Sequence, residues 1–354
     1  MRLDAFTKRV MRKNKSNQSR LPLTISAQYG LVDQITFFNK VVASTDLSNY
    51  YLLKKGEFAY NKSYSSDYPW GAIKRLDNYD QGALSSLYIC FAPQDNVVSD
   101  FILQYFESPK WHKGISEIAV EGARNHGLLN VAVQDFFHTY HYVPKDKKEQ
   151  IKISKLLMLL DERIATQNKI IDKLQTLIKG IAHKVSKQGK PNIRLSECLL
   201  CTSSTLQESD VAEVGAYPVY GANGIVGYLD TYNTTSEAIY IIKDGSGVGA
   251  VSCVKGKCSA TGTLNILQTK EGFSLRYLYF ILKVFSFEPY KTGMAIPHIY
   301  FKDYGKAKIY CPSNQLQCKY ADLLSKIEQK ATAEQKILDN LCSQKQYLLC
   351  QMFI

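Results

Sequence analysis

The sequence predicts a mixed α/β protein in which two globular modules of related architecture are each followed by a long helix. Three observations lead to this fold class: a heptad pattern at two places, an internal repeat that includes both places, and short apolar runs separated by turn residues. At 354 residues, of which 45% are apolar, the chain is long enough for two modules with cores of their own.

The first long helix is predicted from an apolar stripe that runs from Ile153 to Val185. The stripe positions alternate in steps of four and three over more than four heptads, which is typical of a coiled-coil strand. Its principal seam positions are Ile153, Leu157, Leu160, Ile164, Gln167, Ile171, Leu174 and Ile178. Such a stripe needs a partner helix.

The partner is expected within the same chain, because the steps recur from Tyr320 to Met352. Seam positions of this second helix include Leu324, Ile327, Leu338, Leu341 and Leu348, with Glu334 and Lys345 as polar members. The residues around Ile171 match those around Leu338 at an offset of 167, and a proline precedes each helix. The sequence therefore predicts a tandem duplication.

Four segments follow from this repeat: a first module over 1–142, a helix over 143–188, a second module over 189–310 and a helix over 311–354. Short alternating or apolar runs predict strands in the first module at 21–25, 50–53, 57–60 and 83–91. Short helices are expected there at 100–106 and 109–118. In the second module, Asn223 and Gly224 predict a tight turn between two strands.

The net charge of +12 is concentrated in two segments. Residues 1–20 carry +6, and residues 143–187 carry another +6. A basic N-terminal arm favours nucleic acid as the partner. For the helix, a polyanion and an ordinary solvated lysine-rich face explain the charge equally well.

Two loops of the first module are richer in polar and aromatic groups than turns require. Arginine can bind guanine and asparagine can bind adenine through paired hydrogen bonds, while aromatic rings can contact thymine methyl groups. The candidate DNA-binding residues here are Lys62, Ser63, Tyr64, Ser65, Trp70, Lys74, Arg75, Arg124, Asn125 and His126. A structural turn, with Arg124 paired to an acid, is the alternative for the second loop.

The second module has different loops in the corresponding places. A glycine-rich loop over 243–249 either lets backbone N–H groups approach DNA phosphates or forms a plain turn, since no Walker-type ending follows it. Residues 293–298 are the counterpart of the loop that contains Arg124. The candidate residues are Tyr220, Asn223, Lys243, Ser246, Lys291 and His298. Related modules with different loops predict two different specificities.

Cysteine usage and hydropathy limit the class of protein further. Nine scattered cysteines favour reduced thiols, and Cys198 and Cys201 form a CxxC pair without the second pair that a zinc site needs. We therefore expect no metal site. No apolar run is long enough for a membrane span, so a soluble cytoplasmic protein is expected.

The combination of duplicated modules and helices resembles the specificity subunit of type I restriction-modification enzymes. The resemblance covers nearly the whole chain and rests on Pro144 with Glu149-Gln150, on residues 122–130, and on residues 217–224. The second helix departs from it, because Gln315-Leu316-Gln317-Cys318 replaces the Glu-Gln pair.

The resemblance implies a non-catalytic prokaryotic protein with two target-recognition domains and an antiparallel pair of helices. It also implies a bipartite, asymmetric target in double-stranded DNA. The expected partners are two modification subunits, which methylate adenine N6, and restriction subunits. Any S-adenosylmethionine, ATP and magnesium are expected in those partners, with no cofactor in this chain.

Two other classes of function remain to be compared with this one. A stand-alone DNA methyltransferase or nuclease is disfavoured, because the sequence has no [ND]PP[YFW] box, Walker A motif or carboxylate cluster. A coiled-coil scaffold is disfavoured, because it does not need two divergent sets of polar loops.

Overall fold

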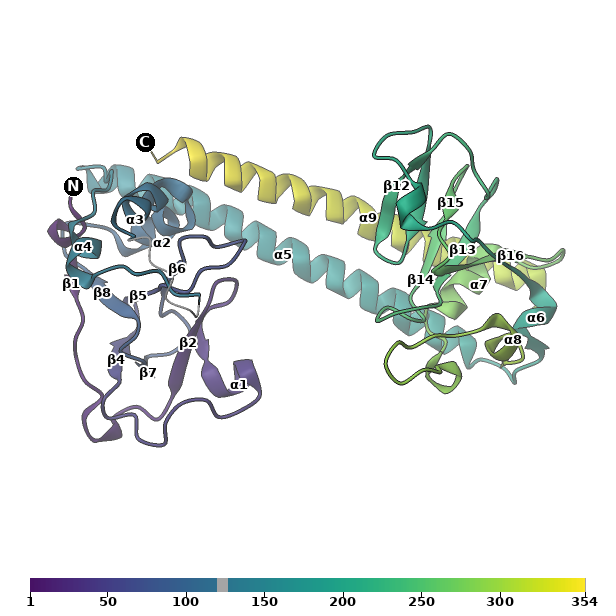
Figure 1. Cartoon of the computed structure of the whole chain (residues 1–354), viewed down its shortest axis with the longest axis horizontal. Helices are drawn as coiled ribbons and strands as arrows, with labels where there is room; N and C mark the ends of the chain where they lie inside the picture. The colour runs from purple at the N-terminus through teal and green to yellow at the C-terminus, as the bar shows by residue number, and fades with distance from the viewer. Residues whose placement is uncertain (120–126, 354) are drawn as a thin grey trace. The chain divides into compact units, whose positions relative to one another are not determined.

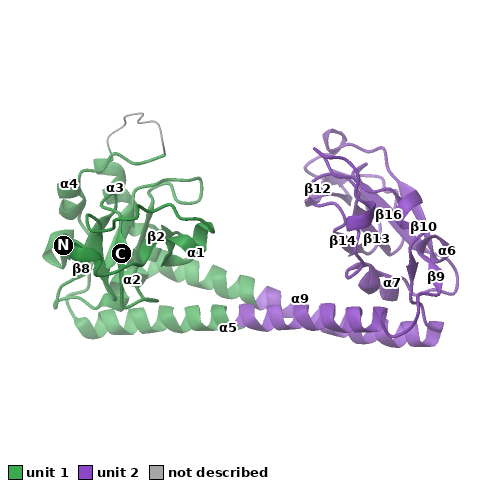
Figure 2. Cartoon of the chain, turned by 90° about the horizontal axis from the view of Figure 1, so that it is seen from below, with its two compact units in different colours: residues 1–166, 338–354 green, residues 167–337 purple. Residues whose placement is uncertain are grey.

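The computed structural model describes residues 1–119 and 127–353, which form two compact units (Figure 2). Unit 1 comprises residues 1–166 and 338–354, and unit 2 comprises residues 167–337. The long helices are α5 (Lys147–Ser186) and α9 (Asn314–Gln351), within the predicted ranges 143–188 and 311–354 (Figure 1). The unit boundaries fall inside both helices, so each unit contains part of α5 and part of α9.

Unit 1 contains two four-stranded sheets. The antiparallel sheet has the order β1 (Thr7–Arg9), β8 (Ile89–Pro93), β5 (Phe58–Asn61), β6 (Ala72–Arg75). The mixed sheet has the order β3 (Gly30–Asp33), β2 (Pro22–Ser26), β7 (Gln81–Leu84), β4 (Tyr51–Lys54). The single strand predicted over 83–91 is wrong, because a turn in which Tyr88 N–H donates to the Ser85 carbonyl separates β7 from β8.

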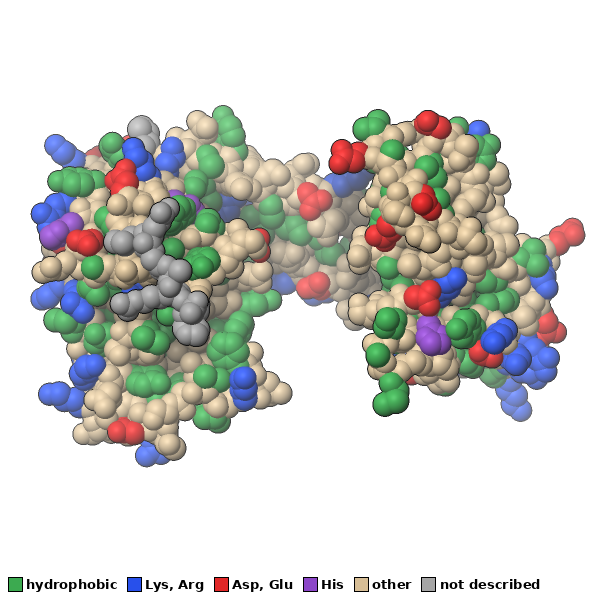
Figure 3. Space-filling view, viewed as in Figure 1, with side chains coloured by type: hydrophobic (Ala, Val, Ile, Leu, Met, Phe, Trp, Pro, Cys, Tyr) green, Lys and Arg blue, Asp and Glu red, His purple; other side chains and the backbone are tan. Residues whose placement is uncertain are grey.

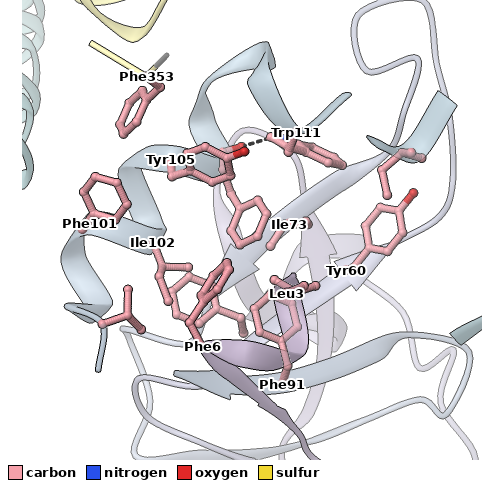
Figure 4. Close-up of a cluster of buried hydrophobic side chains, with 14 of the residues drawn as sticks. Leu3, Phe6, Tyr60, Ile73, Phe91, Phe101, Ile102, Tyr105, Trp111 and Phe353 are labelled. Carbon is pink, nitrogen blue, oxygen red and sulfur yellow. Dashed lines mark hydrogen bonds between the residues drawn. The ribbon is translucent and has the colours of Figure 1, made fainter. Parts of the chain in front are cut away.

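The helices of unit 1 cover the antiparallel sheet and help to form an aromatic core. They are α2 (Ser99–Glu107), α3 (His112–Ile118) and α4 (Val133–His138), while α1 (Gln34–Phe38) follows β3; single 3-10 turns lie at Leu3–Ala5, Lys15–Asn17 and Pro109–Trp111. Tyr60 stacks on Phe136 with ring centroids 5.0 Å apart. Phe353 packs edge-on against Phe101 and Tyr105, so residues after α9 complete this core (Figure 4).

Unit 2 is built from three sheets. The largest has the order β10 (Leu199–Ser203), β16 (Leu264–Thr269), β13 (Ala238–Ile242), β14 (Val251–Val254). The others are β12 (Gly224–Leu229), β11 (Tyr217–Gly221), β15 (Ser259–Ala260), and the pair β17 (Lys308–Ile309) and β9 (Ile193–Arg194). The helices are α6 (Leu195–Cys198), α7 (Leu275–Leu282) and α8 (Phe301–Tyr304), with 3-10 turns at Glu208–Asp210 and Glu288–Tyr290.

The tight turn predicted at Asn223 and Gly224 is confirmed. Gly221 of β11 is paired with Gly224 of β12, which leaves two residues in the turn. Gly224 has a φ of 103°, a conformation that favours glycine.

The backbone shows the duplication directly. In each unit, a strand next to the start of the module pairs with one strand of a four-stranded antiparallel sheet, and the order β1-β8-β5-β6 matches β10-β16-β13-β14. The Leu3 N–H donates to the Thr139 carbonyl at 2.9 Å, and the Leu195 N–H donates to the Ala307 carbonyl at 3.0 Å. The predicted tandem repeat is therefore present in both topology and hydrogen bonding.

A buried glutamine attaches each long helix to its module. Gln150 Oε1 accepts from the Val98 N–H at 2.7 Å, and its Nε2 donates to the Pro144 carbonyl at 2.7 Å. Gln317 makes the same two bonds, from the Ser274 N–H at 3.0 Å and to the Pro312 carbonyl at 2.8 Å. The departure noted in the second helix is thus smaller than the sequence suggested, because Gln317 takes the place of Gln150.

Within each unit, α5 and α9 run antiparallel. In unit 1 the Lys345 ammonium contacts the Asp161 carboxylate at 2.5 Å, and in unit 2 the Tyr320 hydroxyl donates to Gln188 at 2.6 Å, while Gln167 contacts Glu334. The predicted seam positions on both helices are all buried or half-buried.

Candidate nucleic-acid interface

In unit 1, two loops that are distant in sequence lie against each other through backbone hydrogen bonds. The Leu129 N–H donates to the Lys62 carbonyl at 2.9 Å, and the Tyr64 N–H donates to the Gly127 carbonyl at 3.0 Å. The first loop connects β5 to β6, and the second precedes α4. The structure therefore places Lys62, Ser63 and Tyr64 beside the segment that follows Arg124.

Unit 2 pairs its own two loops in the same way. The Ile299 N–H donates to the Lys243 carbonyl at 2.9 Å, and the Gly245 N–H donates to the Pro297 carbonyl at 3.0 Å. The first loop connects β13 to β14, the counterparts of β5 and β6. Lys243 and His298 are thereby brought together, and residues 293–298 occupy the place expected for the counterpart of the loop with Arg124.

The β5–β6 loop of unit 1 presents polar and aromatic side chains from a firmly held base. Ser63, Tyr64 and Ser65 are exposed, and Lys62 and Trp70 are half-buried. At the base, the Tyr60 hydroxyl donates to the Trp70 carbonyl at 2.9 Å. Gly71 has a φ of 77°, and a Cβ there would lie 2.1 Å from the Asn61 carbonyl oxygen, so only glycine fits.

Arg124, Asn125 and His126 lie outside the described residues. Their predicted roles therefore remain predictions from the sequence.

Lys74 and Arg75 are engaged in ion pairs at the side of the module. Lys74 contacts Glu107 at 2.6 Å, and Arg75 contacts Asp77 and Asp100 at 2.7 Å each. These two side chains follow the loop along β6, and their charges are already matched by acids of the same unit. We assign them to holding β6 against α2 rather than to the exposed loop surface.

The glycine-rich loop of unit 2 is a compact turn. The N–H groups of Gly245, Val248 and Gly249 donate to the carbonyls of Pro297, Gly245 and Ile242, so none of these three is left for a phosphate. Val248 is buried beneath the loop, whereas Ser246 is exposed. The plain-turn alternative is favoured for the backbone, and Ser246 remains as a side chain that can bind a ligand.

The other candidates of unit 2 occupy two places. Lys291 is exposed, pairs with Glu288, and lies in the same loop as His298. Tyr220 and Asn223 belong to the β11–β12 hairpin. Asn223 is exposed at the turn, and the ring of Tyr220 packs against that of Tyr240 with ring centroids 5.9 Å apart. The hairpin residues therefore belong to a different sheet from the paired loops.

The basic N-terminal segment is folded and is not a free arm. Residues Thr7–Arg9 form β1, which pairs with β8. Arg2 is paired with Asp4, and Arg12 with Glu57 at 3.0 Å. On the face seen in Figure 3, Lys and Arg side chains are scattered over unit 1 and gather at one edge of unit 2.

The cysteines are free thiols, and the CxxC pair is structural. Burial raises the pKa of Cys198 to about 12 and that of Cys201 to about 11, so both thiols stay protonated. Among residues 1–119 and 127–353, no group of three or more metal-ligating side chains comes together. Nor is any helix in that part of the chain both long and apolar enough to cross a membrane.

Comparison with known proteins finds similarity over part of the chain. Residues 198–342 match the family described as type I restriction modification DNA specificity domain. This match covers most of the second module and much of the second long helix, less than half of the chain, and shows similarity to this family over that part. A segment of 112 residues is 26% identical to the type I restriction enzyme EcoprrI specificity subunit of Escherichia coli. That match covers 32% of this chain and 28% of the relative.

Two solved structures share the fold of this chain over nearly its whole length. A type I restriction-modification system S subunit from M. genitalium aligns with a TM-score of 0.65 and 19% identity, covering 100% of this chain and 95% of the other. A chain from a structure that concerns complex assembly and conformational transition of the type I R-M system aligns with a TM-score of 0.57 and 14% identity. That alignment covers 99% of this chain and 95% of the other.

Sequence reasoning missed four exposed apolar side chains outside the seam of the long helices. They are Leu156 and Ile170 of α5 and Leu323 and Ile337 of α9, which lie 167 residues further on in each case. The signal was available, because each pair repeats two heptads apart, with a charged residue, Arg163 or Lys330, at the heptad position between. These positions are a further trace of the duplication, and exposed apolar side chains this far apart do not by themselves define an interface.

Proposed function

We propose that this chain is the specificity subunit of a type I restriction-modification enzyme and that each unit binds one half of a bipartite, asymmetric DNA target. One observation carries the proposal: the same pairing of two loops is built once in each unit, with different side chains on it. A duplicated scaffold with divergent loops suits a protein that recognises two different half-sites.

The chemistry of the two loop sets fits contacts to duplex DNA. Tyr64, Ser65 and Trp70 in unit 1 offer hydroxyl groups and rings for base edges, and Ser246 and His298 do so in unit 2. Lys62 and Lys243 supply positive charge for phosphates, which gives affinity without sequence selection, whereas the charge of Lys291 is matched by Glu288. Arg124, Asn125 and His126 belong to the first set on sequence grounds.

The duplication also motivates the proposed partners. Exposed apolar positions are repeated on the two long helices, since Leu156 matches Leu323 and Ile170 matches Ile337. Repeated modules and helices fit two copies of one subunit, and we assign these to the two modification subunits, which methylate adenine N6. Restriction subunits then complete the enzyme, in the prokaryotic cytoplasm. S-adenosylmethionine, ATP and magnesium are assigned to the partners, and no catalytic role to this chain.

The test is selection of the preferred site from a randomised DNA pool by the assembled methyltransferase. We expect two short specified sequences separated by an unspecified spacer. Tyr64→Ala should relax one half-site and His298→Ala the other, each by about 1–3 kcal/mol at the affected position. Tyr140→Ala, which removes another exposed tyrosine of unit 1 outside the two loops, is the control.

If both variants relax the same half-site, or if binding falls equally on all sequences, the assignment of one half-site to each unit is wrong. A purified chain that binds S-adenosylmethionine tightly without partners would favour the alternative of a stand-alone methyltransferase. A chain without any DNA preference in the complex would favour a scaffold.

The long helices are also proposed to set the spacer. Adding one heptad after Gln167 and another after Glu334 keeps the seam and lengthens the pair by about 10 Å, because an α-helix rises 1.5 Å per residue. The spacer should grow by roughly two or three base pairs, at 3.4 Å each, while both half-sites stay the same. An unchanged spacer would mean that the modification subunits fix the geometry.

A further inference from the structure

The seam of unit 2 contains one buried polar contact. Gln167 and Glu334 are 8% and 7% exposed. Gln167 Nε2 donates to the Glu334 backbone carbonyl at 3.0 Å and also to its carboxylate. The seam positions nearest in sequence, Ile171 on α5 and Ala331 and Leu338 on α9, are apolar.

The two residues of this contact are counterparts in the duplication. They lie 167 residues apart, the same offset that relates Ile171 to Leu338. A position on the first helix thus faces its own equivalent on the second helix. The same two positions would therefore meet in any antiparallel pairing of these helices in this register, including pairings between two copies of the chain.

The three possible pairings differ at this layer. Pairing of the first helix with the second gives the observed amide–carboxylate hydrogen bond. Pairing of two second helices would bring two Glu334 carboxylates together in the seam, and like charges that are withdrawn from water repel strongly. Lys330, which contacts Glu334 from the same helix, offsets only part of this repulsion. Pairing of two first helices would place two neutral Gln167 amides together and lose the charge-assisted hydrogen bond.

We propose that the Gln167–Glu334 pair selects the partner of each long helix, so that the first helix pairs with the second and second helices of different copies are kept from pairing. A single polar pair in an apolar seam is known to fix partner and register at some cost in stability. This role concerns assembly of the chain itself and does not depend on the proposed DNA recognition.

Four variants of the full-length chain test the proposal. Gln167→Glu places two carboxylates at the layer and should lower the Tm by roughly 5–10 °C at neutral pH. Gln167→Glu with Glu334→Gln exchanges the residues and should restore most of that loss, because Arg163 stands to position 167 as Lys330 stands to position 334. Glu334→Gln alone should be tolerated.

The fourth variant, Gln167→Leu with Glu334→Leu, removes the selection and should raise the Tm. After refolding at high protein concentration, light scattering should detect more dimers of this variant than of the natural chain. The proposal is overturned if the exchanged pair is as unstable as Gln167→Glu, since the contact is then not responsible. It is equally overturned if the Leu-Leu variant forms no more dimers than the natural chain.

Discussion

Units 1 and 2 attach their modules to the long helices with one shared contact and one that differs. Gln150 and Gln317 make the same pair of bonds to backbone groups in both. The acids that lie about three helical turns further along differ: Asp161 accepts from Gln104 and Lys345, whereas Glu328 accepts from Arg276, Tyr279 and Lys283. After duplication, contacts directed at the backbone were retained, while contacts between side chains diverged.

The units also differ in how the chain completes their cores. Unit 2 is continuous, but the core of unit 1 includes Leu341, Leu349 and Phe353 from the second helix and the residues after it. The two units should therefore respond differently to changes in that segment.

The largest expected difference comes from Phe353→Ala. Phe353 is 2% exposed and touches two aromatic rings, so its truncation should cost unit 1 about 3–5 kcal/mol and leave unit 2 unaffected. Calorimetry should show the unfolding of one unit shifted to lower temperature, and limited proteolysis should identify it. Phe280→Ala is the matched change in unit 2, and equal loss of both units in either variant would contradict their independence.

The next largest difference between the units is expected in their stability at acid pH. Burial, with the nearby N-terminal charge, lowers the pKa of His141 in unit 1 to about 4. Between pH 6.5 and 4 the unfolded chain binds a proton that the folded unit does not, so unit 1 loses up to about 3 kcal/mol as the pH falls through this range. NMR titration of the imidazole checks the pKa, and a value near 6.5 would remove the effect.

Gln150→Leu and Gln317→Leu should produce equal and separate effects. Each leaves a partly buried backbone N–H, that of Val98 or Ser274, without its glutamine partner, at a cost of about 1 kcal/mol to its own unit. Chemical denaturation followed by hydrogen exchange at Val98 and Ser274 would locate the loss. Gln329→Leu, at an exposed position of α9, is the control. If only one of the substitutions Gln150→Leu and Gln317→Leu destabilises its unit, the shared contact is not equivalent in the two units.

The smallest effect is expected at the divergent acids. Glu328→Gln should destabilise unit 2 by about 1 kcal/mol, and Asp161→Asn should cost unit 1 less, because its carboxylate is more exposed and meets a single cation. Thermal melts in low and high salt measure this difference. Added salt should reduce it, and a loss that does not change with salt would point to packing instead of charge.

The repeat and the long helices were predictable from the sequence because heptad spacing and matching residues are local patterns. Hence the seam around Ile171 and the turn at Asn223 could be placed in advance. The partners of single charged residues could not: Lys74 and Arg75 look like DNA-binding groups until Glu107 and Asp100 are found beside them. Nor does the sequence show that Gln317 replaces Gln150, because the contact depends on Val98 and Ser274, which lie in modules of different sequence.

The discontinuity of unit 1 also governs the order in which the protein can form on the ribosome. Residues 1–166 emerge first, but their core lacks Leu341, Leu349 and Phe353 until the whole of unit 2 has been translated. Unit 2 can fold as soon as its own residues are free, because it needs nothing from the later segment. The nascent first module therefore exposes part of its aromatic core to solvent until the last residues of α9 and Phe353 have been made.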